Sequence, residues 1–161
     1  MLAATLREAG RAVVVAPRRL WRSLAPHSIS TAAMEAPPLP VALQVLVADD
    51  DDDMRLYLTG CLRGFGLVAL TVTEAGNGRD ALLLARAFTF DLIISDLVMP
   101  GLDGLALCRA LKADAATASI PFLLVSGETR APPDCADGFL EKPFNAAGLR
   151  AHVERLLASP P

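Results

Sequence analysis

Short apolar runs alternate with amphipathic segments along most of the chain, beginning at Gln44. The runs are rich in Val, Leu and Ile and are bounded by Gly, Pro or Asp, which is typical of buried strands. They predict strands at residues 44–48, 67–73, 92–94, 121–125 and 138–141.

The segments between these runs place apolar residues at helical spacing. From Met54 onward, one face of the first predicted helix carries Met54, Leu58, Cys61, Leu62 and Phe65. Either Asp52 or Asp53 is suited to cap its start. The same periodicity predicts further helices at residues 80–87, 104–113 and 145–157.

This order of strands and helices predicts an α/β fold. Strands that alternate with helices form a parallel sheet covered on both faces, with right-handed crossovers. We therefore predict a single doubly wound domain over residues 44–158, followed by a short tail at residues 159–161.

Residues 1–43 differ in composition from the predicted domain. They carry five Arg against two Glu, and a Pro-rich stretch from Ala36 to Pro40 closes them. We interpret them as a disordered or weakly helical extension with a linker. An Arg-rich, acid-poor leader is typical of an organelle transit peptide, and an over-extended gene start with Met34 as the true first residue is the alternative that we favour.

Composition narrows the class of function. The chain has 161 residues, of which 53% are hydrophobic and 20% charged, as expected for a globular domain. No apolar run reaches the length of a membrane span. After Leu43, ten basic residues face sixteen acidic ones, which argues against direct binding of nucleic acid. Cys61, Cys108 and Cys135 fit neither a zinc site nor a disulfide framework, so we expect a reducing, cytoplasmic setting, or an organelle if the leader is a genuine transit peptide.

Polar residues stand where four of the predicted strands end. Asp49 and Asp50 follow the first strand, Asp96 the third, Ser126 the fourth and Lys142 the fifth. Any one of them could be a surface or turn-capping residue, but ligands of open α/β sheets bind at this edge. Converging carboxylates repel one another unless a cation is bound, and oxygen ligands suit Mg²⁺. Magnesium, a carboxylate nucleophile and a Lys together predict the handling of a phosphoryl group.

The motifs at these positions read VLVADDDDDMR, DLIISDLVMPGLDG, PFLLVSG and GFLEKPF, and EAGNGRDAL follows the second strand. Together they resemble the receiver domain of two-component response regulators. The resemblance implies a flavodoxin-like sheet with strand order 2-1-3-4-5. It also places a helix between Ser126 and Lys142, where Pro132 and Pro133 intrude. We therefore expect this fourth helix to be short, irregular or absent.

The resemblance also assigns a role to each site residue. It implies that Asp96 is the phosphoacceptor, and that Asp49, Asp50, Asp96 and the backbone carbonyl of Val98 hold Mg²⁺. It further implies that Ser126 and Lys142 bind the phosphoryl group and that the aromatic residue Phe139 responds to it. Pro143 is a candidate for a cis peptide bond. The implied phosphodonor is a sensor histidine kinase or a phosphotransfer protein, and the implied output is contact with a downstream protein.

The predicted function is phosphorylation-dependent signalling by a stand-alone receiver, since no output module follows Leu157. Such a domain catalyses only its own phosphorylation and dephosphorylation. A non-phosphorylated pseudo-receiver that only binds partners is one alternative. The other is a haloacid-dehalogenase-type phosphatase using Asp49 and Asp51, although only Glu154 follows Lys142 where that class needs an acidic pair.

Overall fold

A computed structural model describes residues 43–67, 69–127 and 133–158 of the chain. Five parallel strands form one sheet in the order β2-β1-β3-β4-β5, which confirms the predicted fold class. The strands are β1 (Leu43–Ala48), β2 (Leu70–Ala75), β3 (Leu92–Asp96), β4 (Phe122–Ser126) and β5 (Gly138–Glu141). The helices are α1 (Asp52–Arg63), α2 (Gly78–Ala87), α3 (Gly104–Lys112) and α4 (Ala146–Ala158).

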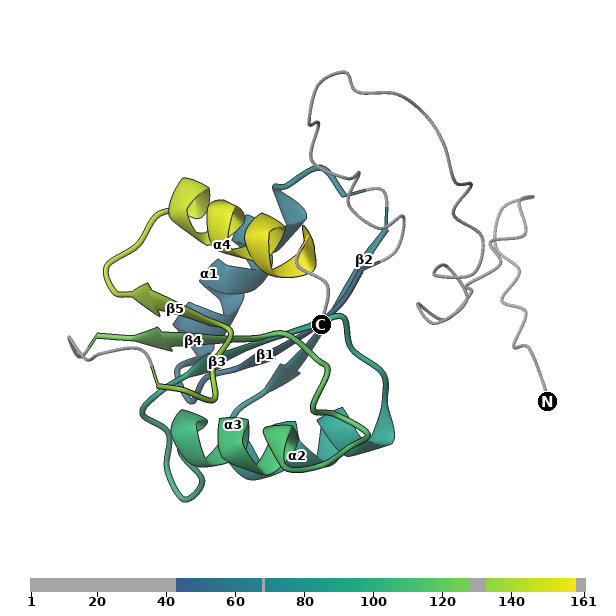
Figure 1. Cartoon of the computed structure of the whole chain (residues 1–161). Coiled ribbons are helices and arrows are strands. Elements are labelled where there is room, and N and C mark those ends of the chain that lie inside the picture. The colour runs from purple at the N-terminus through teal and green to yellow at the C-terminus, as the bar shows by residue number, and fades with distance from the viewer. Residues whose placement is uncertain (1–42, 68, 128–132, 159–161) are drawn as a thin grey trace, which may run out of the picture. The chain divides into compact units, whose positions relative to one another are not determined.

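The helices cover both faces of the sheet, with α1 and α4 on one face and α2 and α3 on the other (Figure 1). The central strands β1, β3 and β4 are therefore buried on both faces, which explains their nearly continuous apolar sequences. Two hydrophobic clusters result. One packs β-strand residues against α1 and α4 around Leu58 and Val153, and the other packs them against α2 and α3 around Ala81 and Leu107.

Several element boundaries differ from the prediction, and two of these differences have a clear structural reason. Asp51, and not Asp52 or Asp53, caps α1: its side chain accepts hydrogen bonds from the backbone N–H groups of Asp53 and Met54. Asp51 can do so because its backbone is extended, whereas Asp52 already lies within the helix. The second strand begins at Leu70 and not at Leu67, because β2 pairs in register with β1 from Leu43↔Leu70 onward.

The described helices and strands extend from Leu43 to Ala158. Leu43, assigned above to the linker, is the buried first residue of β1, and α4 continues to Ala158. The rest of the predicted extension and the tail at residues 159–161 lie outside the described residues. No helix within the described part of the chain is long and apolar enough to cross a membrane.

The prediction allowed only a short or irregular helix, or none, in the connection between β4 and β5. The described residues of this connection, 127 and 133–137, contain a turn and no helix, while residues 128–132 lie outside the described part. Lys112 Nζ holds the end of this connection by donating to Asp137 Oδ2 at 2.7 Å. Asp137 Oδ2 also accepts the Phe122 backbone N–H at 2.8 Å, so the approach to β5 is tied to β4.

Candidate functional site

The predicted site residues lie at the carboxyl edge of the sheet. Because the strands are parallel, the ends of β1, β3, β4 and β5 meet at this edge. The Lys142 backbone N–H donates to the Ser126 carbonyl at 2.7 Å, which sets the residue after β5 beside the end of β4. Asp96 ends β3, and Asp49 follows β1 directly.

The Lys142 side chain joins two carboxylates from different strands. Its Nζ donates to Asp96 Oδ1 at 2.6 Å and to Asp49 Oδ2 at 3.4 Å. Both aspartates are buried, with 1% of Asp49 and 7% of Asp96 exposed. Two buried negative charges thus share one ammonium group, which offsets part of their repulsion.

The second oxygen of each carboxylate is held by the backbone. Asp49 Oδ1 accepts the Asp51 N–H at 2.9 Å, and Asp96 Oδ2 accepts the Val98 N–H at 2.7 Å. Short local bonds of this kind fix the side-chain orientation in the loops that follow the strands. Asp96 therefore presents Oδ1 toward Lys142 and the open edge of the sheet.

The pKa values at this edge reflect both burial and charge. Burial raises the pKa of Asp49 above its usual value, although the Asp51 N–H and the Lys142 charge counteract this. For Lys142, burial alone lowers the pKa, but the hydrogen bond to Asp96 and the charges of both aspartates outweigh it and raise the pKa. Lys142 is thus held in its charged form at neutral pH.

The remaining predicted site residues differ in how deeply they are buried. Ser126 is buried at the end of β4, and Asp50 and Val98 are exposed. Phe139 is partly buried in β5 and packs against the hydrophobic cluster on the α2–α3 face. The peptide bond between Lys142 and Pro143 is cis.

The donor set at the edge suits a hard cation. It consists of the carboxylate oxygens of Asp49 and Asp96, and Asp50 follows Asp49 in the chain. Within the described residues, no three acidic, His or Cys side chains already converge on one point. Burial raises the pKa of Asp49, and a bound cation would favour its charged form. The residues therefore fit Mg²⁺, with Lys142 beside it.

Two residues that shape the site, Arg55 and Gly104, were not predicted from the sequence. Arg55 donates to the Asp49 backbone carbonyl at 2.7 Å. The available signal for it was a basic residue close after the acidic run, separated from Asp53 only by Met54. Gly104 is the first residue of α3 and packs against the backbone of Asp96. The sequence around Gly104 does not predict this contact.

We expect Gly104→Ala to destabilise the fold by about 3 kcal/mol, near the upper end for overpacking. A Cβ at Gly104 would lie 2.0 Å from the Asp96 carbonyl oxygen and 2.9 Å from Leu124 Cδ1, so α3 and β3 would have to separate. Urea unfolding measures the change. The control is Gly60→Ala in α1, where nothing lies within 4 Å and Ala should stabilise the helix. Equal stability of Gly104→Ala and the parent would contradict the expectation.

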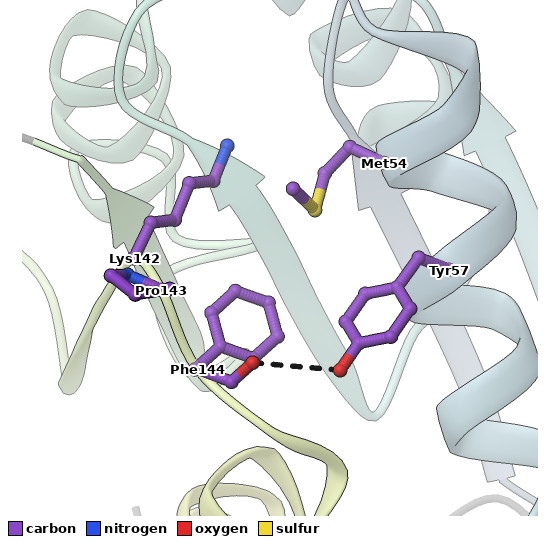
Figure 2. A pocket seen from close by; sticks show the side chains of 5 residues that line it. All are labelled: Met54, Tyr57, Lys142, Pro143 and Phe144. Atoms are coloured by element: carbon purple, nitrogen blue, oxygen red, sulfur yellow. Dashed lines mark hydrogen bonds between the residues drawn. The ribbon is translucent and has the colours of Figure 1, made fainter.

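A pocket of about 350 Å³ opens beside Lys142, between α1 and the segment after β5. Figure 2 shows the side chains that line it: Met54, Tyr57, Lys142, Pro143 and Phe144. The Tyr57 hydroxyl donates to the Phe144 carbonyl at 3.5 Å, and the two ring centroids lie 5.8 Å apart. The site is therefore flanked by an apolar, partly exposed surface.

Comparisons with known proteins agree on one family. The family model described as the response regulator receiver domain matches residues 45–154 of this chain. The chemotaxis protein CheY of Pseudomonas aeruginosa is 31% identical over 120 residues, which cover 71% of this chain and 95% of that protein.

Solved structures show the same fold. The signal receiver domain of a signal transduction histidine kinase from Syntrophus aciditrophicus is 34% identical, with a TM-score of 0.65 over 73% of this chain and 91% of that one. The response regulator TrrA from Thermotoga maritima, solved in complex with Mg²⁺-BeF, is 28% identical, with a TM-score of 0.65 over 71% of this chain and 99% of that one.

Proposed function

The chain belongs to the response regulator receiver family, and from this premise we propose that it accepts a phosphoryl group on Asp96 in a Mg²⁺-dependent reaction. The observation that carries the proposal is the contact of Lys142 Nζ with Asp96 Oδ1 at 2.6 Å, beside buried Asp49. A buried carboxylate next to a fixed ammonium group is equipped to react with an anionic phosphodonor.

The proposed step is attack of an Asp96 carboxylate oxygen on phosphorus. A new P–O bond forms to Asp96, and the bond from phosphorus to the donor's nitrogen or oxygen breaks, with its electron pair leaving on the donor. The Val98 N–H holds Asp96 Oδ2. The oxygen that reacts is therefore Oδ1, which lies beside the Lys142 ammonium group. Lys142 then pairs with the new phosphoryl oxygens, and the Ser126 hydroxyl donates to them.

We propose that Asp49, Asp50, Asp96 and the Val98 carbonyl hold the Mg²⁺ ion. When bound, the ion would offset the negative charge that collects as the phosphoryl group approaches these carboxylates. The relative TrrA was solved in complex with Mg²⁺-BeF, which supports a metal site in this domain.

The Asp50→Ala variant should bind Mg²⁺ about tenfold more weakly or worse, a loss of about 1.4 kcal/mol for each factor of ten. Calorimetric titration with MgCl₂ measures this directly. Asp53→Ala is the matched control, since it removes an equally exposed carboxylate from the same acidic run but from within α1. Equal losses in both variants would assign the effect to net charge, and no loss in Asp50→Ala would remove Asp50 from the metal site.

The proposed phosphodonor is a sensor histidine kinase or a phosphotransfer protein, and the proposed output is contact with a downstream protein. A protein donor must bring its phosphoryl group to Asp96, so it has to cover the surface around the edge of the sheet. The pocket formed by Tyr57, Phe144 and their neighbours adjoins Lys142 and offers apolar area for that contact.

Phosphorylation by acetyl phosphate tests the proposal without a kinase. Intact-protein mass should show a gain of one phosphoryl group that requires Mg²⁺, is prevented by EDTA, and decays as the domain dephosphorylates itself. No gain, with Mg²⁺ binding confirmed by calorimetry, would favour a pseudo-receiver. Sustained turnover of a small phosphate ester would favour a phosphatase instead.

A further inference from the structure

Arg55 lies in α1, and its side chain reaches back to the acidic loop, residues 49–51 between β1 and α1. Its side chain is only 15% exposed. Nη1 donates to the Asp49 carbonyl oxygen at 2.7 Å, Nη2 pairs with the Asp52 carboxylate, and Nε lies 3.5 Å from Glu74 Oε2. One guanidinium group therefore contacts three points on two different segments of the chain, the β1–α1 region and β2.

The contact with Glu74 is itself supported. Thr59 Oγ1, buried on the next turn of α1, donates to Glu74 Oε1 at 2.9 Å. The chain of contacts from Thr59 through Glu74 to Arg55 ends on the Asp49 carbonyl. It ties the start of α1 to β2 and, through the peptide group between Asp49 and Asp50, to the acidic loop.

We propose that Arg55 is a positioning residue that sets this loop for Mg²⁺, an inference that rests on the proposed function above. Holding the Asp49 carbonyl fixes the plane of the peptide that joins Asp49 to Asp50. That plane decides the direction in which both side chains leave the backbone. Arg55 also pairs with Asp52, so this carboxylate of the acidic run is already engaged by a positive charge.

A purely electrostatic role for Arg55 predicts the opposite sign. A positive charge near a cation site repels the cation, so its removal would strengthen Mg²⁺ binding. A positioning role predicts weaker binding when the guanidinium is lost, because the ligands are no longer held in place. Residues that orient metal ligands typically change metal affinity about 10- to 100-fold when they are replaced.

The experiment is calorimetric titration of the full chain and its variants with MgCl₂. We expect Arg55→Met to weaken Mg²⁺ binding about tenfold. Arg55→Lys should be similarly weak, because one ammonium group keeps the charge but cannot make the same set of contacts. Thr59→Val changes no charge and should weaken binding by roughly a factor of three, since it only loosens Glu74. The control is Arg150→Met, which removes an equal charge from α4, where Arg150 pairs with Glu154.

Equal or tighter Mg²⁺ binding by Arg55→Met would overturn the inference, as would full affinity in Arg55→Lys. Should Arg55→Met fail to fold by circular dichroism, the Lys and Thr59→Val variants decide the question. Amide hydrogen exchange of residues 50–53 without metal gives a second readout, and it should be faster in the Arg55 variants. If the parent chain itself binds no Mg²⁺, the proposed function fails, whereas unchanged exchange in the variants refutes the role of Arg55 alone.

Discussion

Asp96→Asn is expected to abolish Mg²⁺-dependent phosphorylation by acetyl phosphate. The amide lacks the negative charge that makes the carboxylate a nucleophile, so no P–O bond should form at this position. The substitution keeps the shape of the side chain and removes one of two buried negative charges, and its amide oxygen can still accept one of the two hydrogen bonds, from the Val98 N–H or from the Lys142 ammonium group. The fold should therefore persist, and intact-protein mass should show no gain.

Asp103→Asn is the matched control for this variant. Asp103 lies in the same stretch and caps α3 by accepting the Ala106 N–H at 2.7 Å, a role that Asn fulfils equally well. It should take up the phosphoryl group like the parent chain. Labelling that persists in Asp96→Asn would place the acceptor on another side chain.

Lys142→Ala should slow phosphorylation by about a hundredfold and remove the conformational response to it. The magnitude follows from the loss of one charged donor aimed at the reacting group. Without the amine, buried Asp49 and Asp96 lose the cation that they share, and the new phosphoryl group lacks its partner. Some uptake should remain, because the nucleophile and the acidic residues are unchanged.

Amide NMR spectra before and after phosphorylation measure this response. In the parent chain the signals of Ser126 and Phe139 should shift, since Ser126 ends β4 at the site and Phe139 lies in the neighbouring strand β5, paired in register with Leu124. In Lys142→Ala they should stay in place even when mass shows that phosphate is bound. Arg109→Ala, which removes an exposed positive charge from α3, is the control. A normal shift in Lys142→Ala would refute its role in the switch.

The apolar pattern was sufficient to predict the layered sheet. Runs such as Leu92 to Ile94 are buried on both faces, so their composition alone distinguishes them from surface strands. The site was equally predictable as a set, because parallel strands bring Asp49, Asp96 and Lys142 to one edge whatever their separation in the chain. The predicted boundaries were less accurate where pairing decides them, as at Leu70, whose place depends on its partner Leu43.

Sequence alone thus determined the fold class, the edge of the sheet at which we propose that the chemistry occurs, and the residues that lie there. Each of these follows from local periodicity and from the direction of parallel strands. Only the tertiary structure decided that Asp51 caps α1, that Gly104 must lack a side chain beside the Asp96 carbonyl, and that Arg55 holds the Asp49 peptide. Such contacts depend on where packed elements lie relative to one another, to within a few tenths of an ångström. The spacing of residues along the chain does not encode these positions.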